Sequence, residues 1–123
     1  MSVKVDLEQL ADALTDFAFA YLITVGDDYR AHTVAVDPVL AEGVFALGGS
    51  GNSTRRDAIA HPVVTLVWPP REPSGYTLIV DGQAEVADDG LRVTPQRAVL
   101  HRPATPATPT ASGCGDDCVP LGG

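Results

Sequence analysis

A loop of glycines and hydroxyl residues, followed by two arginines, is the segment of this sequence best suited to chemistry. Residues 48–53 read Gly-Gly-Ser-Gly-Asn-Ser, and Thr-Arg-Arg follows. Glycines let backbone N–H groups approach a ligand closely, and the first turn of a helix carries partial positive charge that attracts anions. We therefore predict an anion-binding site whose candidate ligands are Ser50, Asn52, Ser53, Thr54, Arg55 and Arg56.

The two arginines contribute most to this prediction. A positive side chain in the first turn of a helix opposes the helix dipole, and a bound anion reverses that cost by pairing with both guanidinium groups. The alternative is an ordinary surface loop, in which Arg55 and Arg56 meet Asp57 or solvent. Both interpretations place the segment at the start of a short helix.

A pair of cysteines is the other unusual feature, in the run Cys114-Gly-Asp-Asp-Cys118. A small disulfide, a metal clip completed by a histidine and a passive tail all remain open. Neighbouring carboxylates disfavour a thiolate, which argues against a highly reactive pair. Two cysteines alone do not make a metal centre, so we predict none.

The N-terminal part of the chain has the periodicity of one amphipathic helix over residues 5–16. Apolar side chains recur three and four positions apart, and Asp6 with Gln9 has the spacing of a capping box. The apolar face is made by Leu7, Leu10, Ala11, Leu14 and Phe17.

The rest of the chain reads mainly as strands separated by turns. A second helix is expected over residues 54–60, where Thr54 and Asp57 have capping-box spacing and Pro62 ends the element. Gly82 is expected to mark a β-bulge. Runs rich in β-branched and aromatic residues predict strands at 17–25, 30–36, 44–47, 63–68, 75–86 and 91–93, with a short one at 98–101.

The composition changes at the end of the chain. Residues 103–123 are rich in Pro, Ala, Thr, Ser and Gly, and Pro-Ala-Thr occurs twice in succession. Such a segment buries too little apolar surface to order itself. We therefore expect one domain over residues 1–102 and a disordered, cysteine-containing tail over 103–123.

Charge excludes some classes of partner. The 123 residues carry 16 acidic and 8 basic side chains, for a formal net charge of −8. A surface this acidic is unsuited to a nucleic-acid backbone or to anionic membranes. No apolar run resembles a signal peptide or reaches the roughly 18–20 residues of a membrane span, so we expect a cytoplasmic protein.

This order of elements predicts an α+β fold with a barrel-like antiparallel sheet. About six strands in about 100 residues leave apolar edges unless the sheet closes or pairs with another chain. Dimerisation is therefore a physical expectation, and we predict a homodimer.

The stretch from Arg30 to Val86 resembles the pyridoxamine 5'-phosphate oxidase-like family of FMN- and F420-binding split barrels. A Val-Phe-Ala-Leu strand leads into the Gly/Ser/Asn loop, and a short arginine-bearing helix ends at His61-Pro62. An apolar strand then ends at Trp68-Pro69, and Val80-Asp81-Gly82-Gln83-Ala84 is similar to a "v-x-G-x-a" stretch of the family. The loop departs from the family pattern, because Asn52-Ser53-Thr54 stands where Ser-Arg-Lys is usual.

The resemblance implies a six-stranded antiparallel split β-barrel with an N-terminal helix and one helix between strands. It implies that the predicted anion site holds the phosphate of FMN, or of F420 as the alternative. His32 and Thr33 would line the flavin or deazaflavin ring, and Trp68 would pack nearby. The alternatives are a strand histidine whose polar end meets solvent, and a tryptophan that serves packing alone.

The function expected on this basis is that of a flavin- or deazaflavin-dependent oxidoreductase acting on a small-molecule substrate. The cofactor supplies hydride chemistry in such proteins, and the protein positions it. One alternative is a non-catalytic protein that binds or carries a flavin, F420 or haem. Another is a degenerate barrel that serves only in protein–protein contact, with the cysteine-containing tail as its functional part.

Overall fold

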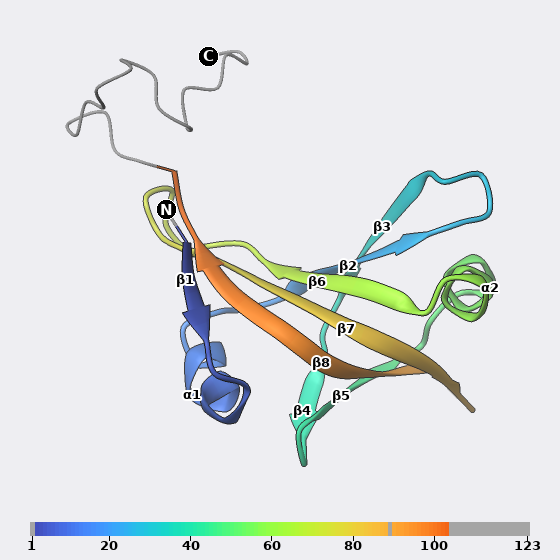
Figure 1. Cartoon of the computed structure of the whole chain (residues 1–123), viewed down its shortest axis with the longest axis horizontal. Coiled ribbons are helices and arrows are strands. Elements are labelled where there is room, and N and C mark those ends of the chain that lie inside the picture. The colour runs from blue at the N-terminus through green and yellow to red at the C-terminus, as the bar shows by residue number, and fades with distance from the viewer. Residues whose placement is uncertain (1, 89, 104–123) are drawn as a thin grey trace.

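The computed structural model describes residues 2–88 and 90–103. Strands make up most of this chain, and the two short α-helices lie at opposite ends of the sheet (Figure 1). In chain order the elements are β1 (Ser2–Val5), the 3₁₀ helix η1 (Leu7–Gln9), α1 (Leu10–Leu14), β2 (Ala20–Val25), β3 (Ala31–Val36), β4 (Val39–Ala41), β5 (Val44–Gly48), α2 (Asn52–Ala60), β6 (Val63–Trp68), β7 (Thr77–Ala87) and β8 (Gly90–His101).

The strands form one curled antiparallel sheet of eight strands. Their order is β3-β2-β6-β7-β8-β5-β4, and β1 pairs separately with β8. Helix α2 lies at one end of the sheet beside the turn between β2 and β3, whereas α1 lies at the opposite end (Figure 1). The molecule is therefore a half-barrel of the α+β class, as expected for a split barrel.

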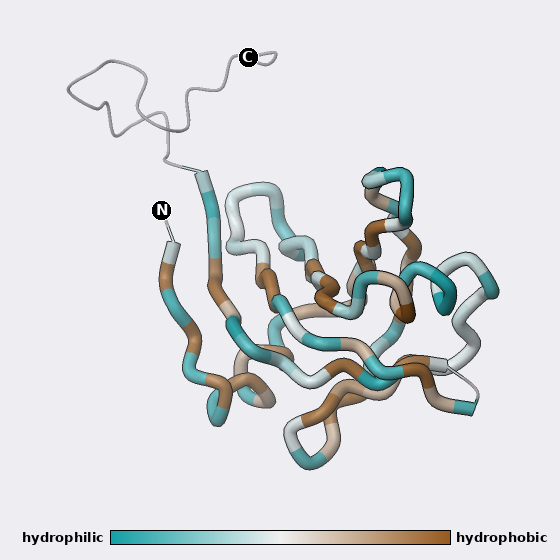
Figure 2. Tube along the Cα trace, turned by 45° about the vertical axis from the view of Figure 1, so that its right-hand side comes forward, coloured by the Kyte–Doolittle hydropathy of each residue, from teal (hydrophilic) through white to brown (hydrophobic). Residues whose placement is uncertain are grey.

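The core follows from side-chain alternation along the strands. Successive residues of a strand point to opposite faces, so every second residue of β2, β6 and β7 is buried. Figure 2 shows the corresponding alternation of hydrophobic and hydrophilic residues. The largest fully buried side chains include Phe45, Leu22, Leu66, Leu78 and Val80.

The predicted strand count of six was too low. Two short strands, β1 and β4, were missed, and the segments 91–93 and 98–101 belong to one strand, β8. Three- and four-residue strands carry too little periodicity to be recognised. They form because neighbouring strands supply their backbone partners.

The expected helix over residues 5–16 was also wrong in its extent. Its first residue, Val5, is instead the last residue of β1, where it lies opposite Ala98 of β8. A 3₁₀ turn follows, and only Leu10–Leu14 forms an α-helix. The side chain of Asp6 makes no capping hydrogen bond, so the capping-box interpretation fails.

The second helix begins two residues earlier than predicted. Gly51 is its N-cap residue, and no side chain caps it, which corrects the assignment of Thr54 and Asp57 as a capping box. Both residues are instead buried within the helix. The stretch Val63–Trp68 is a strand with the predicted bounds.

The bulge predicted at Gly82 is confirmed. The pairing of β7 with β8 shifts register between Asp81 and Gly82, and Gly82 lies opposite Pro95. A Cβ atom on Gly82 would lie 2.6 Å from the carbonyl oxygen of Thr94, so only glycine fits there. Pro95, which has no N–H to donate, is accommodated at this irregular point of the strand.

The predicted tail falls almost wholly outside the described residues, as do Cys114 and Cys118. Within residues 2–88 and 90–103, no helix is long and apolar enough to cross a membrane.

Candidate functional site

The predicted anion site lies where the chain passes from β5 into α2. A Cβ atom added to Gly48, Gly49 or Gly51 would meet nothing within 4 Å, so the loop borders open space. The first turn of α2 contains no acidic residue and no side-chain cap. Asn52 and Ser53 are exposed there, which leaves the positive end of the helix accessible to an anion.

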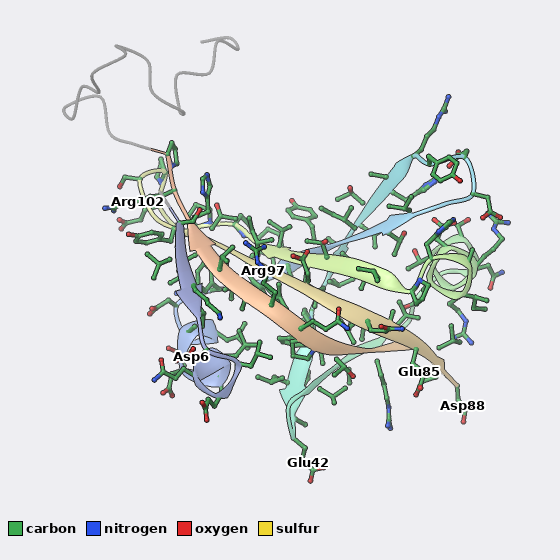
Figure 3. The ribbon with its side chains drawn as sticks, in the orientation of Figure 1. Asp6, Glu42, Glu85, Asp88, Arg97 and Arg102 are labelled. Carbon is green, nitrogen blue, oxygen red and sulfur yellow. The ribbon has the colours of Figure 1, made fainter. Side chains whose placement is uncertain are left out.

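Arg55 has a structural partner at the neighbouring hairpin. Its Nη1 atom donates to the carbonyl oxygen of Ala87 at 3.0 Å and to that of Gly90 at 3.4 Å. These bonds join α2 to the turn between β7 and β8, the end of the sheet where Figure 3 labels Glu85 and Asp88. A guanidinium group with two carbonyl acceptors fixes this end of the sheet.

Arg56 lies on another side of α2, next to a group of polar residues. A cavity of about 220 Å³ separates the helix from the β2–β3 turn. It is lined by Gly26, Asp27, Asp28, His32, Arg56, Asp57 and Ala60. Of the predicted site residues, the structure therefore brings His32 and Arg56 together.

Asp57 is the buried member of this group. Its side chain is only 7% exposed, and its Oδ2 atom accepts a hydrogen bond from Thr24 Oγ1 at 3.3 Å. His32 Nε2 lies 3.8 Å from the same oxygen and 4.0 Å from Asp28 Oδ1. Strand β2, the β2–β3 turn, strand β3 and helix α2 thus converge on one carboxylate.

A second imidazole holds the same turn against the C-terminal end of α2. His61 Nε2 lies 3.1 Å from Asp27 Oδ1, and the rings of His61 and Tyr29 are 6.1 Å apart. Tyr29 has a positive φ of 61°, which fits the tight turn. Of the residues in these contacts, Asp27 lines the cavity.

Other predicted site residues lie apart from this cavity. Thr33 follows His32 along β3 and faces the opposite side of the strand, in register with Ile23. Trp68 is 3% exposed and packs in the core, with its ring 5.3 Å from that of Phe45. Ser50 is half-buried in the loop before α2.

Sequence reasoning did not find Thr24, Asp28 and Asp57 as members of a site. Thr24 and Asp57 are 33 positions apart in sequence, so they form no motif with a recognisable spacing. Asp57 was interpreted only as a partner for capping or for the arginines. One signal was available in the sequence: Thr24 is a polar residue at a position of a predicted strand that should be buried, which indicates a buried polar partner.

A second hollow of about 420 Å³ lies at the opposite end of the molecule. Its walls include Phe17 after α1, Arg71 and Tyr76 from the β6–β7 connection, and Leu100 on β8. The Arg102 guanidinium lies 4.6 Å from the centre of the Tyr76 ring. This hollow contains none of the predicted site residues.

Comparison of the sequence with known proteins identifies close relatives. No family model matches the chain. Proteins of Mycobacterium bovis and Mycobacterium tuberculosis, each named as an uncharacterized protein, are 50% identical to it over a 133-residue alignment. The alignment covers 94% of this chain and 94% of each relative. The chain belongs to the family of these mycobacterial proteins.

Solved structures show which fold this mycobacterial family has. An FAD-binding protein of Mesorhizobium loti matches with a TM-score of 0.64 at 12% identity, over 81% of this chain and 96% of that one. The FAD-binding protein of Mycobacterium smegmatis matches with a TM-score of 0.58 at 16% identity, over 81% and 97%. A protein named F420 reductase matches with a TM-score of 0.51 at 18% identity, over 76% and 93%. At these identities the likeness shows the shared split-barrel fold.

Proposed function

We propose that this protein binds a flavin or deazaflavin cofactor and acts as an oxidoreductase on a small molecule. The observation that supports the proposal is the likeness in fold to proteins named for FAD binding and for F420 reduction. FMN, the cofactor implied by the sequence resemblance, and F420 are the first candidates. The protein's part is to hold and orient the cofactor, which supplies hydride transfer when bound.

The start of α2 fits the phosphate of such a cofactor. Its first turn carries no acid and no side-chain cap, and the glycine loop before it borders open space. Backbone N–H groups of this turn and the hydroxyl of Ser53 would hold the phosphate. Arg56 is the available cation, because Arg55 donates to Ala87 and Gly90.

The ring of the cofactor would lie against β3 on the side of Thr33. The exposed residues Thr33 and Ala35 lie opposite Ile23 and Tyr21 of β2. Small and apolar side chains in this row offer a flat surface for a planar ring. His32 points to the other side, toward α2, so Thr33 is the better candidate for the ring contact.

The same surface is where a second copy of the chain would bind. Tyr21, Val67 and Ile79 lie in register across β2, β6 and β7, and Phe19 stacks edge-to-face on Tyr21 with the ring centres 5.3 Å apart. Strand β3 is exposed along nearly all its length. An apolar surface beside an unpaired strand edge favours association, so the proposed functional unit is a homodimer.

Titration of cofactor-free protein with FMN, FAD and F420 tests the proposal, with flavin or deazaflavin fluorescence as the readout. We expect micromolar or tighter binding of one of them, which corresponds to about −8 kcal/mol or better. Binding followed by substrate-dependent reoxidation of the reduced cofactor supports the oxidoreductase. Binding without turnover of any substrate indicates a carrier, and lack of binding by all three contradicts the proposal.

A further inference from the structure

We propose that residues 103–109 of this chain, which we call the proline stretch, bind in the hollow between α1, the β6–β7 connection and β8. The proline stretch reads Pro-Ala-Thr-Pro-Ala-Thr-Pro, and it begins at the last residue that the structure describes. The hollow has a volume of about 420 Å³ and would serve as an aromatic groove for a polyproline-type segment. This inference is independent of the proposed cofactor and of its site at α2.

The spacing of the prolines is the first observation. Proline occupies every third position, at Pro103, Pro106 and Pro109. A polyproline II helix has three residues per turn, so in that conformation the three rings form one row along the segment. Each proline ring also fixes φ near the polyproline value, which lowers the conformational entropy that the segment loses on binding.

The walls of the hollow have the composition of a polyproline-binding surface. Such surfaces are grooves lined by aromatic rings, against which proline rings pack. The hollow is lined by Phe17, Pro70, Tyr76 and Leu100, and each of these four residues is half-buried. The Arg102 guanidinium lies over the ring of Tyr76, 4.6 Å from its centre. A row of proline rings would cover the apolar surface that Phe17 and Tyr76 leave open.

Arg71 offers hydrogen-bond donors to the backbone of such a segment. A polyproline II helix has no internal hydrogen bonds, so its carbonyl groups need donors from outside. Within residues 2–88 and 90–103, the Arg71 side chain makes one hydrogen bond, from Nη2 to the carbonyl oxygen of Phe17 at the long distance of 3.4 Å. A guanidinium group has five N–H donors, so most of those of Arg71 remain for the carbonyl groups of the proline stretch.

The charges around the hollow favour an uncharged occupant. Asp16 and Glu72 line it together with Arg71, and Arg102 lies at its rim on Tyr76. Two carboxylates and two guanidinium groups balance, so an anion and a cation each meet charges of their own sign. The proline stretch carries no charged side chain and avoids both repulsions.

The course of β8 brings the proline stretch to the hollow. Leu100 lies in the wall and Arg102 packs on Tyr76, so Pro103 follows directly at the rim. Figure 3 shows Arg102 at the end of β8, beside the β6–β7 connection. At about 3.1 Å per residue, the whole proline stretch extends over only about 19 Å. A tether this short gives an effective concentration in the millimolar range, so weak contacts are sufficient.

The low apolar content of residues 103–123 is compatible with this binding. It prevents the segment from forming a core of its own. In the hollow, the apolar surface is supplied by Phe17, Tyr76 and Leu100 instead. Only the proline stretch, and not the rest of the tail, takes part.

Paramagnetic relaxation in the full-length chain tests the inference. Both cysteines of the chain follow the proline stretch, so Cys118→Ser leaves one thiol, that of Cys114, for a nitroxide label. In ¹⁵N-labelled protein, we expect the nitroxide to broaden the amide resonances of Phe17, Gly75 and Tyr76 at the hollow. The resonances of α2, at the opposite end of the sheet, are expected to keep their widths.

A double variant and a matched control show whether the prolines are responsible. Pro106→Ala with Pro109→Ala removes two rings of the row, so the broadening at the hollow is expected to disappear. Thr105→Ala with Thr108→Ala changes the same number of residues outside the row and is expected to keep the broadening. All four substitutions leave residues 1–103 unchanged.

A mixed sample distinguishes binding within one chain from binding between two copies. It contains ¹⁵N-labelled chain without nitroxide and nitroxide-labelled chain without ¹⁵N, and we expect no broadening at the hollow. Broadening only in the mixed sample would assign the hollow to a second copy and overturn the inference. Broadening that persists in the proline variant, or that disappears equally in the threonine control, would also overturn it, as would its absence from the wild-type stretch.

Discussion

Thr24 on β2 donates its hydroxyl hydrogen to the carboxylate of Asp57 on α2 across a distance of 3.3 Å. Both side chains are buried, and the residues are 33 positions apart in sequence. The bond connects the helix at one end of the half-barrel to the second strand of the sheet. The part-buried pair Thr65–Asp81 makes the same kind of hydrogen bond, so it serves as a reference for the contribution of Thr24–Asp57 to stability.

Thr24→Val is expected to lower the free energy of unfolding by about 1–3 kcal/mol, because it leaves the buried carboxylate without its donor. Thr65→Val, which affects a half-exposed carboxylate that keeps Arg97, is expected to cost under about 1 kcal/mol. Urea unfolding followed by circular dichroism measures both. Equal losses in the two variants would contradict the role given to the Thr24–Asp57 bond.

Substitution of the two neighbouring arginines is expected to have different effects, on stability for Arg55 and on cofactor binding for Arg56. Arg55→Ala removes the donor to Ala87 and Gly90 and is expected to lower the free energy of unfolding by about 1–3 kcal/mol. Arg56→Ala, at an exposed position, is expected to change it by less than about 0.5 kcal/mol but to weaken cofactor binding about tenfold. Thermal unfolding and cofactor titration of each variant measure the two effects, and the reverse pattern would refute the assignment.

A negative charge at the start of α2 is expected to oppose the cofactor phosphate without harming the fold. In Ser53→Asp, the carboxylate lies in the first turn, where the helix dipole stabilises it by about 0.3–1 kcal/mol. Cofactor affinity is nevertheless expected to fall at least tenfold. Thr94→Asp adds the same charge at an exposed position on β8 and is the control. Unaltered affinity in Ser53→Asp would show that the phosphate binds elsewhere.

Association through the outer face of β2 is expected to be sensitive to charge at Tyr21. Tyr21→Lys places an ammonium in the apolar row with Val67 and Ile79 and is expected to convert the proposed dimer to monomer. Val39→Lys changes an apolar residue on β4, at the other edge of the sheet, that is more exposed than Tyr21, and should leave the proposed dimer intact. Light scattering after size-exclusion chromatography gives the masses. A wild-type monomer, or a dimer in Tyr21→Lys, would rule out this interface.

Elements with a clear local signal could be predicted from the sequence. The strand Val63–Trp68 was found with its exact bounds, and the bulge at Gly82 was found from the glycine alone. The N-terminal helix was predicted to begin too early because Val5, at its start, pairs with Ala98 of β8, far away in the sequence. A local pattern contains no information about a partner strand at that distance.

The sequence indicated the local features of the candidate site but not the contacts that the site makes with distant strands. The loop and helix around Ser53 are local, and their glycine and hydroxyl content is visible in the sequence. The direction of the Arg55 side chain is set by the β7–β8 hairpin, and the burial of Asp57 is set by β2. Such contacts depend on the order of the strands in the sheet. That order cannot be read from the spacing of residues along the chain.

Strand β8 has a consequence for the order in which the chain folds. It pairs with β7 on one side and with both β5 and β1 on the other. The last strand of the sheet is therefore hydrogen-bonded to the first. Ser2 therefore finds its partner, His101, only after nearly the whole described chain has been synthesised. Closure between ends so distant in sequence gives a high contact order, which places folding on the millisecond-to-second scale. On the ribosome, β1 must wait for β8 to emerge before its backbone can pair and Val5, its one buried residue, can be covered.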